Sequence, residues 1–104
     1  MPANLDTSSL EENAREVASV LRALANDRRL LILCNLAERK EVNVSTLTKA
    51  VRLSQSALSQ HLAKMRDEGL VATRRDGQVI WYRIADRRIE RLLATLNKLY
   101  CRTL

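Results

Sequence analysis

The sequence contains few glycine, proline and aromatic residues, and this scarcity excludes several classes of protein. Its 104 residues include two glycines, one proline and no phenylalanine, whereas 46% of the residues are hydrophobic. Such a composition is neither that of a disordered chain nor that of a low-complexity one. The length suits a single domain, residues 1–104, with a core of modest size.

Long apolar runs are missing as well. No stretch approaches the length of a membrane span. The first residues, MPANLDTSSLEEN, have neither the basic nor the apolar region of a signal peptide. We therefore expect a cytoplasmic protein without a membrane partner.

Groups that could build an active site are scarce. The chain has one histidine, His61, and two cysteines, Cys34 and Cys101, without a CxxC motif, a Cys/His cluster or a glycine-rich loop. We therefore expect neither an enzyme nor a cofactor. In a reducing cytosol, two such cysteines are by default separate thiols. His61 borders the apolar positions Leu58 and Leu62, which favours a packing or phosphate-contacting role over metal ligation.

Positive charge is abundant and unevenly distributed. The formal net charge is +6 and the pI is near 10.0, yet residues 1–16 hold four acidic residues and one basic residue. The rest of the chain is therefore strongly basic. A basic body favours nucleic acid, because binding to phosphates releases condensed counterions. Other polyanions would attract the same charge.

Residues 46–67 have the pattern of a helix-turn-helix. Ser45 is expected to cap a short helix whose inward residues are Leu47, Ala50 and Val51. Ser54 is expected to cap a second helix, whose inward residues are Leu58, Leu62 and Met65. Gly69 is expected to end the second helix. Its outward side carries hydroxyl, amide and amine groups, which suit bases and phosphates, although an ordinary surface helix is the alternative. These outward residues are Ser56, Ser59, Gln60 and Lys64.

A β-hairpin is predicted over residues 71–84. Two alternating segments flank Asp76-Gly77, a strong hairpin signal, with Arg74 and Arg75 near the tip. This pairing assigns one face to the core and places Trp81 on the other. The expected core residues of the hairpin are Val71, Ile80, Tyr82 and Ile84.

Amphipathic helices are expected at both ends of the chain. The first begins at Ser8 or Ser9, and the last follows a cap at Asp86. Between them, Asn26 and Asp27 cap a helix over 28–38 that is apolar nearly all round. One small domain cannot easily bury both terminal stripes, so we expect them to form a homodimer interface. Its residues are Leu10, Val17, Leu21, Leu92, Leu96, Leu99 and Tyr100.

The predicted fold is mainly α with a small β-hairpin, a winged helix-turn-helix in the order α-α-α-α-β-β-α. In this arrangement the segments ALANDRRLLIL, LSQSALSQHLAKMRDEGLV and RRDGQVIWYRI resemble the ArsR/SmtB family of winged-helix repressors over about residues 10–102. The resemblance implies a homodimer on the inverted-repeat operator of double-stranded DNA. The implied contacts with the major groove or its phosphates are Ser54, Gln55, Ser56, Ser59, Gln60 and Lys64, and His61 is expected to contact the DNA backbone. Arg74, Arg75 and Gln78 of the wing are expected at the minor groove.

Most of that family senses metals, and this sequence departs from the metal-binding pattern. The helix before the turn, VSTLTKAV, contains no Cys, His, Asp or Glu, and the last helix offers Asp86 and Glu90 without a histidine. Zinc and nickel sites need several nitrogen or sulfur ligands at one point. We therefore expect no metal site.

The cysteines in ILC and LYC are similar to those of the metal-independent branch of the family, which senses persulfides or oxidants. This similarity implies that Cys34 and Cys101 form the sensor pair, and that a disulfide or polysulfide bridge releases the repressor from its operator. Cys34 lies on an apolar stripe, however, and could be a small buried hydrophobe. Cys101 lies off the stripe beside Lys98 and Arg102, which could favour its thiolate.

Two other functions remain open. The protein could be an activator that displaces a silencing nucleoprotein, as some members of that branch do. It could also be a protein-interaction module whose basic face docks on an acidic partner.

Overall fold

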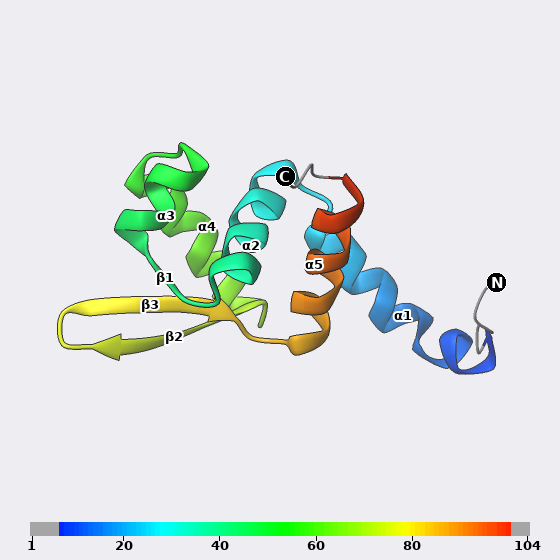
Figure 1. The fold of residues 1–104 in the computed structure, drawn as a ribbon. Coiled ribbons are helices and arrows are strands. Elements are labelled where there is room, and N and C mark those ends of the chain that lie inside the picture. Colours follow the sequence, from blue (N-terminus) through cyan, green and yellow to red (C-terminus); the bar gives the residue numbers. More distant parts are fainter. Residues whose placement is uncertain (1–6, 101–104) are drawn as a thin grey trace.

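The computed structural model describes residues 7–100 and shows a helical protein with a small sheet (Figure 1). This confirms the predicted winged helix-turn-helix. The elements are α1 (Thr7–Leu24), α2 (Asp27–Arg39), β1 (Val42–Asn43), α3 (Val44–Val51), α4 (Gln55–Asp67), β2 (Val71–Asp76), β3 (Val79–Ile84) and α5 (Arg87–Tyr100). The first helix already begins at Thr7, so neither Ser8 nor Ser9 is its N-cap.

The sheet has three strands, one more than expected. Its antiparallel order is β1-β3-β2, and β1 pairs with β3 through Val42↔Tyr82 and Asn43↔Trp81. The added strand ties the chain just before α3 to the base of the hairpin, which forms the wing (Figure 1). A two-residue strand is too short to show an alternating pattern, so the sequence offered no signal for it.

The turn of the wing lies one residue later than predicted. Asp76 pairs with Val79, which leaves Gly77 and Gln78 as the two turn residues. Gly77 has a φ of +63°, and a glycine with positive φ at the first turn position suits a type II′ hairpin. The expected faces are nonetheless correct. Val71 is buried, whereas Ile80 is half-buried nearer the tip.

The hydrophobic core surrounds α2, which packs against α3, α5 and β3. Ile32, Leu33 and Leu36 of α2 are completely buried. The core residues predicted for α4, Leu58, Leu62 and Met65, are also completely buried. Burial of an aliphatic side chain contributes on the order of 1.5–3 kcal/mol, so these contacts fix α4 against the body of the domain.

The α3 helix differs in two details from the prediction. Its N-cap is Asn43, whose Oδ1 accepts a hydrogen bond from the Thr46 N–H at 2.9 Å, and Ser45 lies within the helix. Ala50 is exposed, not inward. Leu47 and Val51 are the buried residues of the helix, and Ala50 lies roughly 100° from Val51 around the helix axis, at about 100° per residue.

The α4 helix has the predicted boundaries at both ends. Ser54 Oγ accepts a hydrogen bond from the Ala57 N–H at 3.1 Å. At the other end, Gly69 has a φ of +77°, and the N–H groups of Gly69 and Leu70 donate to the carbonyls of Arg66 and Met65. These two bonds form a Schellman motif. The helix therefore has satisfied backbone groups at both ends and a defined length.

Candidate DNA interface

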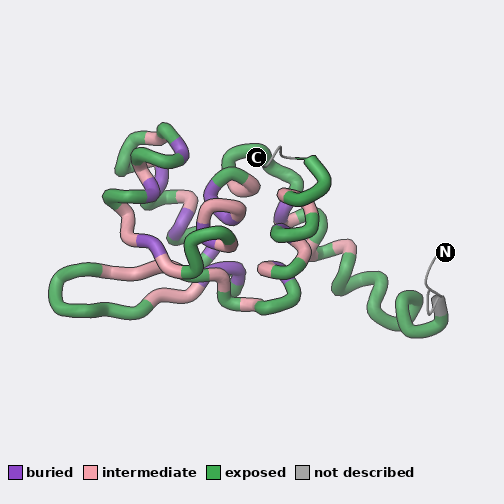
Figure 2. Tube along the Cα trace, in the orientation of Figure 1, coloured by how far each residue is buried: buried purple, intermediate pink, exposed green. Residues whose placement is uncertain are grey.

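The side of α4 that faces away from the core is polar and exposed. Figure 2 colours the residues of the protein by their burial. Gln60 lies near its centre, one turn after Ser56 and one turn before Lys64. These side chains can donate to or accept from base edges and phosphates. The exposed predicted residues of this face are Ser54, Gln55, Ser56, Ser59, Gln60 and Lys64, whereas His61 is half-buried at its edge.

The side chain of Ser54 is assigned two roles at this site, as the N-cap of α4 and as a DNA contact. It is exposed, but its Oγ is already the acceptor for the Ala57 N–H. Its hydroxyl can still donate to a DNA phosphate while it caps the helix. The predicted cap and the predicted contact are therefore compatible.

The two arginines near the tip of the wing differ in their surroundings. Arg74 donates from Nε to both oxygens of Glu41, at 3.1 and 2.9 Å, and from Nη2 to Oε1 at 2.9 Å. Its guanidinium also lies 5.7 Å from the centre of the Trp81 ring, within cation–π range. Arg75 and Gln78 are exposed, and Arg75 has no ion pair with another described residue.

The Arg74–Glu41 contact shifts the protonation equilibria of both groups. Hydrogen bonding from Arg74 lowers the pKa of Glu41, and the same contact raises the pKa of Arg74. Both groups are therefore charged at neutral pH, and the contact ties the wing to the segment before β1. Nothing in the sequence pattern pointed to Glu41, because the two residues lie 33 positions apart.

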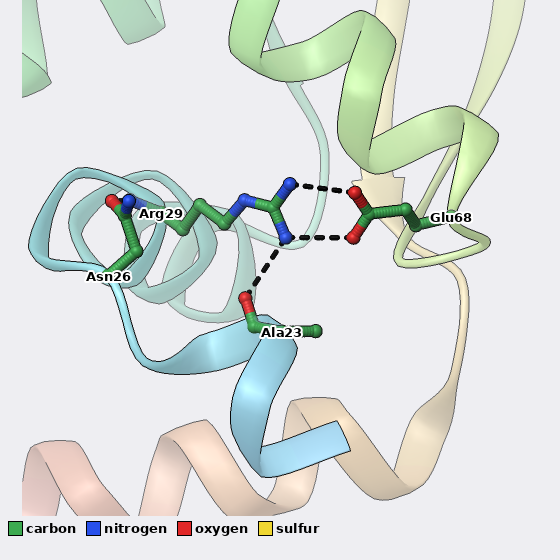
Figure 3. A network of polar contacts seen from close by, with 4 residues as sticks. All are labelled: Ala23, Asn26, Arg29 and Glu68. Atoms are coloured by element: carbon green, nitrogen blue, oxygen red, sulfur yellow. Dashed lines mark hydrogen bonds and ion pairs between the residues drawn. The ribbon is translucent and has the colours of Figure 1, made fainter. Parts of the chain in front are cut away.

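A second ion pair holds α4 against the first two helices (Figure 3). The Arg29 guanidinium donates to both carboxylate oxygens of Glu68, at 2.8 and 2.9 Å, and to the carbonyl of Ala23 at 3.0 Å. Only 12% of the Arg29 side chain is exposed, and the pair lowers the pKa of Glu68. One guanidinium thus joins the end of α1, the start of α2 and the end of α4.

The residues predicted for a dimer interface lie on α1 and α5. Figure 1 shows α1 projecting from the body of the protein, and Leu10, Val17 and Leu21 on it are exposed. Leu99 and Tyr100 on α5 are also exposed, whereas Leu92 and Leu96 are half-buried. An apolar groove of about 560 Å³ lies between the two helices. Four residues of the predicted set line this groove, namely Leu10, Val17, Leu21 and Leu92.

Of the two predicted sensor cysteines, only Cys34 lies within the described residues. Cys34 is half-buried on α2 and packs against the core. Cys101 lies outside the described residues, so its relation to Cys34 stays a prediction.

Within residues 7–100, no group of three or more His, Cys, Asp or Glu side chains could hold a metal ion. No helix of that range is long and apolar enough to cross a membrane.

Comparison with known proteins defines the class. Residues 26–73 match the bacterial regulatory protein arsR family. The chain is 40% identical over 99 residues to the transcriptional activator HlyU of Vibrio cholerae, covering 95% of this chain and 91% of that protein. The chain belongs to the ArsR family of transcriptional regulators. It is a DNA-binding regulator and not an enzyme.

Solved structures support the same assignment. The transcriptional repressor BigR from Xylella fastidiosa superposes with a TM-score of 0.84 at 32% identity, covering 95% of this chain and all of that one. Reduced HlyU from Vibrio cholerae superposes with a TM-score of 0.80 at 41% identity, covering 90% of this chain and 98% of that one. The fold therefore extends over nearly the whole length of both relatives.

Proposed function

We propose that this protein is a cytoplasmic homodimer that binds an inverted-repeat operator through α4 and the wing. The observation that carries the proposal is the exposed polar face of α4, held in place by a buried opposite face and by caps at both ends. Ser54, Gln55, Ser56, Ser59, Gln60, His61 and Lys64 are proposed for the major groove and its phosphates. Arg74, Arg75 and Gln78 are proposed for the minor groove.

The exposed apolar residues of α1 and α5 support the proposed dimerisation. Leu10, Leu21 and Leu99 are too exposed in one protomer to contribute much to its own core. A second copy that covers them would remove this apolar surface from water. A two-fold axis there would place two α4 helices on successive major grooves, about 34–36 Å apart.

A thiol switch between Cys34 and Cys101 is proposed to control release. One thiolate attacks the outer sulfur of a low-molecular-weight persulfide, RSSH, and expels RS⁻, which leaves a protein persulfide. The second thiolate attacks the inner sulfur of that group and expels HS⁻, which leaves a disulfide. A structure of HlyU from Vibrio cholerae in its reduced form supports a redox-dependent state in that relative.

Repression is the proposed outcome of DNA binding, as the name of BigR states for that relative. A second candidate is activation, which the name of HlyU supports. An activator of this fold would act by displacing a silencing nucleoprotein from DNA. Both candidates use the same α4 surface.

The experiment that tests the proposal starts with selection of an operator from random DNA by the reduced protein. Transcription from a promoter with this site is then measured with and without a silencing nucleoprotein. Lower transcription with the regulator alone supports repression, whereas a rise only in the presence of the silencer supports activation. Failure to enrich any sequence would contradict both.

A further inference from the structure

A basic cavity lies on one flank of α4, apart from the wing. Its volume is about 350 Å³, and it is an open depression bordered by the α1–α2 junction on one side and by α4 on the other. We name it the α1–α4 cavity. Its polar lining consists of Arg22, Asn26, Arg29, Gln60, His61 and Lys64.

The charge in this cavity is positive and only partly compensated. No acidic residue among those described lines it. Arg29 is paired with Glu68, but Arg22 and Lys64 form no ion pair with any residue in 7–100. The first N–H groups of α2 are also satisfied, because Asn26 Oδ1 accepts from Arg28 and Arg29 at 3.0 and 3.1 Å. The positive charge available to a ligand therefore comes from side chains.

The position of the cavity points to one class of ligand. An α-helix with its side chains is about 10–12 Å across, and the major groove is about 12 Å wide. When a helix occupies the groove, the phosphates at the edges of the groove therefore lie along the flanks of the helix. Gln60 and Lys64 belong both to the outward face of α4 and to the rim of this cavity.

We propose that the α1–α4 cavity binds a backbone phosphate of the operator beside the base pairs that Gln60 contacts. This inference rests on the proposed function. Arg22 becomes a DNA-contacting residue, although it lies on α1, the helix assigned to dimerisation. Arg29 positions Arg22, because Arg29 Nη1 donates both to the carbonyl of Ala23, the next residue, and to Glu68 at the end of α4 (Figure 3). In this arrangement α1, the helix assigned to dimerisation, and α4, the helix assigned to base recognition, contact the same DNA strand.

The test compares variants by the salt dependence of DNA binding. Arg22→Ala should flatten the slope of log K against log salt by about 0.9 for each phosphate that the variant no longer neutralises. Affinity should fall by the same factor on operator and random DNA, because a phosphate contact carries no sequence information. Arg22→Lys should keep the slope, and Arg15→Ala, an exposed change on the same helix, should leave it unchanged.

Neutral methylphosphonate linkages, placed at one position of each half-site at a time, locate the contact. The wild-type protein should lose affinity when the linkage replaces one particular phosphate in each half-site, and Arg22→Ala should lose nothing further there. Equal losses for both proteins at every position, or an unchanged slope for Arg22→Ala, would overturn the inference. The proposed function would still hold in that case if Gln60→Ala abolished the preference for the operator.

Discussion

Gln60 is the residue that most directly distinguishes a DNA-reading helix from an ordinary surface helix. It is exposed and lies near the centre of the outward face of α4. Gln60→Ala should cost roughly 1–3 kcal/mol on the operator and far less on random DNA, because it removes a base contact. Competition binding on both DNAs measures the difference. Ala63→Ser, on the same exposed face, serves as the control, and equal losses on both DNAs for Gln60→Ala would show that α4 does not read the sequence.

The two wing arginines should differ in their contributions to DNA binding. Arg75 is exposed without an ion pair among the described residues, whereas the Arg74 guanidinium is held by Glu41. Arg75→Ala should therefore flatten the salt slope by about one unit per phosphate contact, and Arg74→Ala should have a smaller effect. Arg39→Ala, a change in charge at the end of α2, should leave the slope unaltered. A larger effect for Arg74→Ala than for Arg75→Ala would contradict this assignment.

The elements differ in how well the sequence predicted them. Helix boundaries and faces were predictable where one short-range pattern decides them, as with Ser54, Gly69 and the apolar stripe of α4. The exposed and buried sides of α4 therefore follow from the residue pattern alone. The same holds for the faces of the wing, because side chains alternate along a strand whatever the turn.

The features that sequence reasoning missed depend on contacts between distant residues. The β1 strand exists because β3 passes beside it, and Glu41 acquires its role from Arg74 on β2. The Arg29–Glu68 pair joins residues 39 positions apart. Arg22 belongs to the candidate DNA interface only because the α1–α2 junction folds back onto α4. No local propensity encodes such pairings.

Dimerisation can be tested on α1 without damage to the core. Leu21 is 53% exposed in the protomer, so Leu21→Glu should leave each protomer folded. In a dimer it would bury a charge without a partner, which is costly enough to separate the subunits. Sedimentation should show monomers, and far-UV circular dichroism should show unchanged helical content. Ser19→Glu, at an exposed position on the other side of α1, is the matched control, and a stable Leu21→Glu dimer would exclude this interface.

At the scale of the whole molecule, a bridge between Cys34 and Cys101 would close a loop of more than half the chain. Loop-closure entropy would then stabilise the oxidised form by about 4 kcal/mol if the bond forms without strain. Treatment with glutathione persulfide should give a protein that resists alkylation, melts at a higher temperature and releases the operator. Intact mass distinguishes a disulfide from a longer sulfur chain.

The single cysteine variants are the control for this switch. Cys34→Ser and Cys101→Ser should each bind the operator when reduced and stay bound after persulfide treatment. Peroxide treatment, run in parallel, shows whether oxidants in general act as inducers. Release of either variant to the same extent as the wild type would exclude the two-thiol mechanism.

In the proposed dimer, two symmetry-related α4 helices read two half-sites on one side of the DNA. The most direct test is to change the distance between the half-sites. Insertion of about five base pairs turns one half-site to the opposite side of the duplex, since one helical turn is about 10–10.5 base pairs. We predict that affinity for this DNA falls toward that for random DNA, whereas affinity unchanged by the insertion would contradict the proposed mode of binding.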